Sequence, residues 1–130
     1  MIRQRFTTTK TKRQMKHTKK LISFTLTSPL PGRGGWGNGY VAIPKCHPCF
    51  GMDYDAIHNK YKSIDVNGGL TFADDYIPGQ PEETKGMWIV GFDTLHYGDT
   101  PQKWPSQQSV LAEALILEKQ LTIIAKRSKR

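Results

Sequence analysis

An apolar stripe near the C-terminus constrains the fold of this chain more than any other feature. Its members recur at steps of four, three, four and three residues, which is the spacing of one helix face. They are Val110, Ala114, Leu117, Leu121 and Ile124. Leu111, Leu115 and Ile123 are predicted to widen the stripe, and Ser106 before it is a typical N-cap residue. We therefore expect a long helix from residue 106.

The layer beneath this helix is predicted to be a β-sheet. Residues 21–27 and 40–43 are rich in β-branched and aromatic side chains and end near proline, as strands do. Residues 87–92 are short, apolar and bounded by glycine, which is typical of a buried central strand. The sequence thus predicts an α+β fold, a small, mostly antiparallel sheet covered by the long C-terminal helix. The same apolar stripe can alternatively pair two copies into a homo-oligomer.

Two smaller elements are expected between these strands. Residues 53–60 fit a short helix with Asp53 as N-cap. Residues 63–66 and 70–72 read as strands joined through Asn67-Gly-Gly69, and Asn-Gly favours a type I′ hairpin turn. The region after them, residues 73–86, is acidic and contains proline and glycine, so an exposed loop is expected there.

The positive charge of the chain lies at its ends. The net charge is +8, and residues 1–20 alone hold eight basic side chains and no acid. Residues 126–130 add four basic side chains, so that residues 21–125, with seven basic and eleven acidic ones, carry −4. We expect a basic, disordered tail over 1–20 and one globular domain over 21–130. A solvated tail is the favoured interpretation of the basic segment, and the alternative is that nucleic acid is contacted, but only through the basic ends.

The lack of a recognisable targeting signal and the pattern of cysteines predict a cytoplasmic location. No apolar run approaches the roughly 20 residues that cross a bilayer, and the N-terminal region lacks a small-residue cleavage site. The two cysteines lie in Cys46-His-Pro-Cys49, a spacing that can be redox-active or half of a zinc site. Because no second cysteine pair exists to complete a zinc site, two reduced thiols are predicted.

A glycine-rich segment is the first candidate for binding. Residues 32–39 hold five glycines together with Arg33, Trp36 and Asn38. Such a segment can direct backbone N–H groups at an anion, with Arg33 adding charge and Trp36 or Tyr40 stacking on a base. The alternative is a loop that needs several positive φ angles.

Polar side chains after the predicted strand 87–92 are the second candidate. Asp93, His96 and Asp99 can supply ligands to Mg²⁺, Mn²⁺ or Zn²⁺, with Asp99 alternatively orienting the imidazole. Asp and His at turns can instead bind backbone donors. We expect the glycine-rich segment to fold over this polar tip and enclose a hollow.

Four motifs in order resemble a family of small proteins encoded by bacteriophages and prophages. They are Gly-Gly-Trp-Gly-Asn-Gly-Tyr-Val at 34–41, Ile-Pro-x-x-His-Pro at 43–48, Gly-Gly-Leu-Thr-Phe at 68–72 and Gly-Phe-Asp-Thr-x-His-x-Gly-Asp at 91–99. The family pattern has histidine before the central Gly-Gly, where this chain has Asn67. The resemblance covers residues 34–120 and implies a phage origin and the cytoplasm of a bacterial host, but no activity.

The sequence leads to three hypotheses about the function of this protein. The leading hypothesis is a non-catalytic binder of a small anionic or nucleotide-like ligand, such as a sponge for a host defence signal. The alternatives are a metal-dependent hydrolase of nucleotides or phosphodiesters, using Asp93, His96 and Asp99, and a protein inhibitor of a host enzyme. The predicted ligand-binding residues are Arg33, Trp36, Asn38, Tyr40, Asn67, Asp93, Thr94 and His96.

Overall fold

The computed structural model describes residues 20–28 and 34–128 and contains one four-stranded antiparallel sheet. Its strands are β1 (Ile22–Thr27), β2 (Gly37–Ile43), β3 (Phe72–Asp74) and β4 (Trp88–Phe92), arranged in the order β1-β2-β4-β3. Residues 1–19 of the predicted basic tail and Arg33 lie outside the described residues. The apolar strand β4 lies between β2 and β3, which confirms the central position expected from its sequence.

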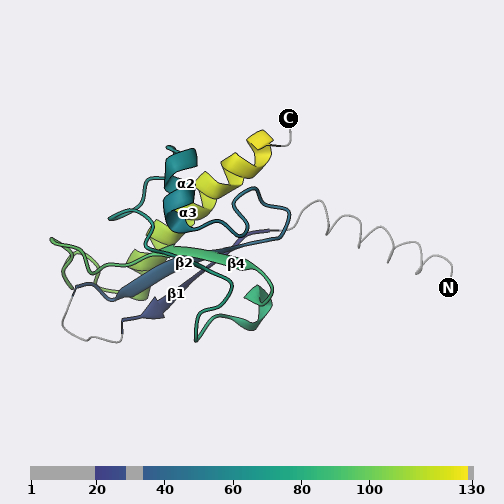
Figure 1. Cartoon of the computed structure of the whole chain (residues 1–130). Helices are drawn as coiled ribbons and strands as arrows, with labels where there is room; N and C mark the ends of the chain where they lie inside the picture. Colours follow the sequence, from purple (N-terminus) through teal and green to yellow (C-terminus); the bar gives the residue numbers. More distant parts are fainter. Residues whose placement is uncertain (1–19, 29–33, 129–130) are drawn as a thin grey trace, which may run out of the picture.

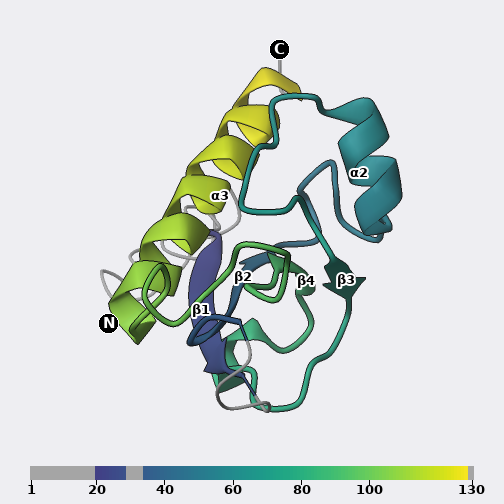
Figure 2. The same ribbon diagram turned by 90° about the vertical axis from the view of Figure 1, so that its left-hand side faces the viewer.

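Both α-helices lie on the same face of the sheet (Figure 1). Helix α2 (Tyr54–Lys60) is short, whereas α3 (Gln107–Ser128) runs the length of the sheet beside β1 and β2 (Figure 2). The segment between β3 and β4, which contains the 3₁₀ turn η1 (Glu82–Thr84), lies on the opposite face. The predicted α+β fold, with a long C-terminal helix over an antiparallel sheet, is confirmed. Within the described part of the chain, no helix is long and apolar enough to cross a membrane.

The apolar stripe of α3 packs as the sequence predicts. All five of its members are buried against the sheet, in a cluster that includes Val41, Val90 and Phe92. The expected widening is wrong in part, because Leu115 and Ile123 are 49% and 39% exposed. A helix that packs on one face of a sheet buries only the stripe of side chains that is directed at the sheet, so side chains beside this stripe stay partly exposed.

The start of α3 is fixed by two serines. The Ser109 N–H donates to Ser106 Oγ at 3.3 Å, and the Ser106 N–H donates to Ser109 Oγ at 3.2 Å. This reciprocal pair satisfies backbone donors that the first helical turn leaves without partners, as a capping box does. Asp53 lies at the N-cap position of α2, as predicted, but its side chain makes no capping hydrogen bond.

The hairpin predicted over residues 63–72 is wrong. Only Phe72 belongs to a strand, β3, and it pairs with β4 rather than with residues 63–66. Backbone donors of this segment bind side chains from the helices instead. The Asn67 N–H donates to Glu113 Oε2 at 2.8 Å, and the Leu70 N–H donates to His58 Nε2 at 2.7 Å. A partner strand is therefore not needed to satisfy these backbone groups.

The turn at Asn67 also differs from the prediction. The Gly69 N–H donates to the Val66 carbonyl at 2.8 Å, which closes a four-residue turn. Gly68 has φ +70°, but every positive φ among the described residues belongs to glycine, so Asn67 does not adopt one. A type I′ turn requires positive φ at both central residues, and positive φ at the second alone is the pattern of type II.

A second apolar cluster covers the face of the sheet away from α3. Tyr40 stacks on Phe24 with ring centroids 5.2 Å apart and meets Phe72 edge-on at 5.6 Å. Its ring lies over Gly91 of β4, where a Cβ would be 2.4 Å from Tyr40 Cδ1. Glycine at position 91 thus lets the tyrosine lie flat across the sheet.

The Cys-x-x-Cys segment is a packed loop. Both cysteines are free, Cys46 is exposed and Cys49 is buried, and burial raises the pKa of the Cys49 thiol to about 11. His47 between them accepts the Cys49 N–H at Nδ1 (3.0 Å), and its Nε2 lies 2.8 Å from the Leu121 carbonyl. Because Nδ1 is an acceptor, Nε2 carries the proton and donates to α3. The prediction of two reduced thiols agrees with this geometry.

Candidate functional site

The segment after β4 gathers the predicted polar residues. His96 Nδ1 lies 3.1 Å from Asp93 Oδ1 and 3.4 Å from Asp99 Oδ2. These are ion-pair distances without hydrogen-bond geometry, since His96 Nδ1 is buried and has no hydrogen-bond partner among the described residues. Asn67 reaches the same place from the turn before β3, and its Nδ2 donates to both Asp99 oxygens at 3.1 Å.

Asp99 is the buried centre of this cluster, with a side chain only 2% exposed. Oδ1 accepts Trp104 Nε1–H at 2.9 Å, and Oδ2 accepts the His96 N–H at 2.9 Å. Burial by itself raises the pKa of the Asp99 carboxyl, but hydrogen bonds from His96, Trp104 and Asn67 outweigh it and hold the pKa below its ordinary value. Asp99 is therefore a carboxylate that ties three chain segments together.

This arrangement does not support the metal site predicted at Asp93, His96 and Asp99. Both Asp99 oxygens already accept protein donors, and Asp93 Oδ1 accepts the Leu95 N–H at 3.0 Å. No group of three or more His, Cys, Asp or Glu side chains within residues 20–28 and 34–128 is placed to hold a metal ion. The carboxylates instead bind backbone and side-chain donors, which was the alternative considered from the sequence.

The glycine-rich segment does lie against the polar tip, but the contact is closely packed. The Gly35 N–H donates to the Thr94 carbonyl at 2.8 Å. A Cβ on Gly35 would lie 2.5 Å from Trp104 Cβ and 2.6 Å from Thr94 Oγ1. The expected hollow is thus filled at this point. Thr94 is fully buried, and its hydroxyl donates to the Gly37 carbonyl at 2.7 Å.

The second half of the glycine-rich segment belongs to the sheet. Gly37, Asn38 and Gly39 belong to β2, so the predicted loop over residues 32–39 is in part a strand. The Trp36 side chain is half-buried against the main core, and the Trp36 backbone N–H donates to the Trp104 carbonyl at 2.8 Å. Its indole is therefore a packing element rather than an open stacking surface.

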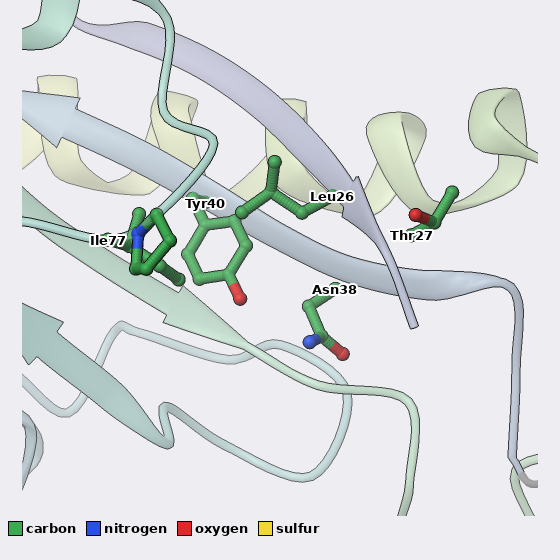
Figure 3. A pocket seen from close by; sticks show the side chains of 6 residues that line it. Leu26, Thr27, Asn38, Tyr40 and Ile77 are labelled. Carbon is green, nitrogen blue, oxygen red and sulfur yellow. The ribbon is translucent and has the colours of Figure 1, made fainter. Parts of the chain in front are cut away.

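A pocket of about 460 Å³ opens on the face of the sheet away from α3. Strands β1 and β2 and the segment after β3 supply its lining, and in Figure 3 helix α3 lies behind these strands. The lining residues are Leu26, Thr27, Asn38, Tyr40, Ile77 and Pro78. This volume falls in the range of about 300–1,000 Å³ that is usual for small-molecule sites.

The polar end of this pocket is formed by Asn38 and Tyr40. In Figure 3 the Tyr40 hydroxyl is directed toward the Asn38 amide. Burial raises the pKa of Tyr40, a hydrogen bond from the Asn38 side chain lowers it, and the nearby Asp93 carboxylate raises it further. Asn38 Oδ1 is buried and has no hydrogen-bond partner within the described residues. A buried acceptor of this kind is costly unless something else satisfies it.

The structure divides the predicted ligand-binding residues into two groups. Asn38 and Tyr40 line the pocket, and Asp93 lies near Tyr40 and joins the cluster that also contains His96 and Asn67. Trp36 and Thr94 pack inside the protein. Sequence reasoning missed Leu26, Thr27, Ile77 and Pro78. The apolar pair Ile77-Pro78 inside an acidic, turn-rich loop was the one signal that this loop covers something.

Comparisons with protein-family models, with curated proteins and with solved structures gave no match to this chain. The resemblance to phage proteins and the cytoplasmic location therefore stay predictions. The candidate site is defined by its own geometry alone.

Proposed function

We propose that this protein is a non-catalytic binder of a small, nucleotide-like molecule, held in the pocket between β1, β2 and the segment after β3. The observation that carries the proposal is the pocket itself, whose apolar walls, Leu26, Ile77 and Pro78, meet the half-buried Asn38 side chain at its polar end. A pocket with apolar walls and few polar groups is the usual form of a small-molecule site. In the phage setting, such a binder would sequester a signalling nucleotide.

The proposal gives the apolar and polar parts of the pocket different roles. Leu26 and Ile77 supply the walls that cover a flat ring, and Asn38 fixes its orientation. Tyr40 takes part through its hydroxyl, because its ring is already stacked on Phe24 and is only 5% exposed. The anionic part of the hypothesis depended on Arg33, which lies outside the described residues. None of the described lining residues is a cation.

The test is the binding of a library of nucleosides and nucleotides to the full chain. Changes in the amide chemical shifts of the protein report which residues contact each compound. We expect changes at Leu26, Asn38 and Ile77. Asn38→Leu should weaken binding of the best compound by about two- to tenfold, because one hydrogen bond contributes roughly 0.5–1.5 kcal/mol. Asn59→Leu, the same substitution on the exposed side of α2, should change nothing.

The stability of the Asn38→Leu variant separates a binding role from a structural one. Leucine at position 38 removes a buried acceptor without a partner, but it also removes the hydrogen bond from the Asn38 amide to Tyr40. Because these two effects oppose each other, the free energy of unfolding of the variant should stay within about 1 kcal/mol of that of the wild type. Loss of binding with stability in this range supports the proposal. Binding that survives in this variant, or a library that perturbs no pocket residue, contradicts it.

A further inference from the structure

We propose that two copies of this chain pair through β1, edge to edge and antiparallel, with Thr25 of each copy opposite Thr25 of the other. Strand β1 lies at one edge of the sheet, and among the described residues only β2 pairs with it. Two features carry this proposal, the outer edge of β1 and the flank of α3 beside it, and neither depends on a bound ligand.

Alternate residues of β1 direct their backbone groups away from β2. The Ser28 N–H donates to the Trp36 carbonyl at 3.0 Å, which continues the register of the β1–β2 pair. Backbone direction alternates along a strand, so the even-numbered residues of β1 face β2. The N–H and C=O groups of Ser23, Thr25 and Thr27 are therefore directed outward. Within the described part of the chain, no hydrogen bond reaches these outward groups.

The sequence of β1 contains none of the usual protections of an exposed strand edge. Such edges are commonly protected by lysine, by proline, by a bulge or by a very short strand. Strand β1 has six residues, Ile-Ser-Phe-Thr-Leu-Thr, and none of them is charged or proline. The opposite edge strand, β3, has only three residues and ends at Asp74. Of the two edges, β1 is therefore the one that can accept another strand.

Helix α3 presents an apolar side chain on the same side of the molecule. Glu118 accepts a hydrogen bond from Ser23 Oγ, so the flank of α3 that carries Glu118 is the one beside β1. Leu115 lies one turn earlier on that flank and is 49% exposed. Because Ala114 lies against Gly39, which is opposite the proposed centre of the interface, Leu115 is level with that centre.

A second copy of the chain fits both the strand edge and the helix flank. Paired strands lie about 4.8 Å apart and α3 packs against β1 and β2 alike, so pairing two β1 strands sets the two α3 helices about 10 Å apart. Helices in contact are about 8–10 Å apart. The two Leu115 side chains then meet across the twofold axis. An extended peptide added to β1 brings no helix and would leave Leu115 exposed.

The test compares two substitutions of almost equally exposed residues on α3. Analytical ultracentrifugation of the full chain from micromolar to millimolar concentration should show a monomer–dimer equilibrium. Leu115→Glu should weaken dimerisation by at least about tenfold, because it sets two like charges against each other at the axis. Ile116 is 48% exposed and lies one turn before Gln120, which donates to the Asp65 carbonyl on the other flank. Ile116→Glu should therefore leave the dimerisation unchanged.

Amide hydrogen exchange in the full chain tests whether the strand edge forms the contact. The Thr25 N–H should exchange slowly in the dimer and rapidly in Leu115→Glu, whereas the Phe24 N–H, which faces β2, should stay protected in both. Dilution of the wild type should have the same effect as Leu115→Glu, so the test does not depend on how that variant folds. A chain that stays monomeric at millimolar concentration, a dimer in which the Thr25 N–H exchanges freely, or equal effects of the two substitutions overturns the proposal.

Discussion

Asp99 shows how one side chain can organise a region with no regular structure. The residues around it belong to the turn before β3, the segment after β4 and the approach to α3, and each donates a hydrogen bond to its carboxylate. Hydrogen bonds to a charged group are worth about 1.5–3 kcal/mol each, and a buried donor left alone costs further free energy. The Asp99 carboxylate thus supplies the hydrogen-bond acceptors that a neighbouring strand would supply in a sheet.

Asp99→Ala should therefore lower the free energy of unfolding by about 3 kcal/mol or more. The reason is that Asn67, Trp104 and His96 lose a shared acceptor in a buried place. Urea unfolding followed by tryptophan fluorescence measures the change. The control is Asp75→Ala in the exposed loop, expected within about 0.5 kcal/mol of the wild type. Equal stability of the two variants would show that the carboxylate is not structural.

His47 should make the protein sensitive to mild acid. Burial lowers the pKa of its imidazole, and the hydrogen bond to the Leu121 carbonyl opposes this effect without cancelling it. The unfolded chain therefore binds the proton more readily. The His47 contribution to stability is complete above about pH 6.5 and is lost as the pH falls below that value.

The measurement is the free energy of unfolding in half-unit steps from pH 7.5 to pH 5. His47→Gln, which keeps a donor and an acceptor, should flatten the decline that the wild type shows over this range. The lowered pKa of Asp99 acts in a separate window, because that contribution persists above about pH 3.8 and is lost only below it. An unchanged slope in His47→Gln would assign the acid sensitivity to another group.

At the scale of elements, the turn at residues 66–69 and the segment after β4 are fitted to each other. A Cβ on Gly68 would lie 2.3 Å from His96 Cε1, so the imidazole rests directly on this glycine. Gly68 also has φ +70°, where other residues are strained. The turn therefore needs glycine for two independent reasons.

Gly68→Ala should destabilise the protein by clearly more than Gly51→Ala. Both glycines have positive φ, which costs alanine about 1–2 kcal/mol, but a Cβ on Gly51 meets nothing within 4 Å. The difference between the two unfolding free energies thus isolates the contact with His96. Chemical-shift changes at His96 and Asp99 in Gly68→Ala alone would report the displaced imidazole. Equal losses in the two variants would mean that only the backbone angle matters.

At the scale of the whole molecule, the net positive charge comes from the two ends of the chain and not from the residues between them. Residues 21–125 carry a net charge of −4, while the excess of basic residues lies at the two ends of the chain. The candidate pocket has no described cation in its lining. Any contact with nucleic acid is accordingly predicted at the ends of the chain, and the proposed contact with a small ligand is on the sheet.

A chain that lacks residues 1–19, and with them seven basic residues, should lose most of any affinity that the full chain has for duplex DNA. Affinity of this kind comes from release of counterions and falls steeply with salt. Fluorescence anisotropy at 50 and 200 mM salt measures it, and circular dichroism checks that the shorter chain remains folded. Retention of the full affinity and salt dependence would place the nucleic acid contact on residues 20–130, which include the basic C-terminal end.

Local periodicity was sufficient for the elements that face the core. The stripe of α3 and the apolar run of β4 repeat at the spacing of a helix face and of a buried strand, and such patterns lie within one continuous segment. Residues 63–66 and 70–71 were wrongly predicted as strands for the opposite reason. Their apolar residues, Ile64, Val66 and Leu70, are buried as expected, but the partners of their backbone donors lie elsewhere in the chain.

The sequence by itself determined which segments are buried, because burial depends on apolar side chains at a regular spacing. Only the tertiary structure decided where the backbone of residues 63–71 finds its acceptors, since Gln120 and Glu113 lie 55 and 46 residues away from the donors at Asp65 and Asn67. It also decided the site, because Leu26, Asn38 and Ile77 become neighbours only when the segment after β3 folds over the sheet. No local pattern records such a contact, since it arises from packing between elements rather than within one.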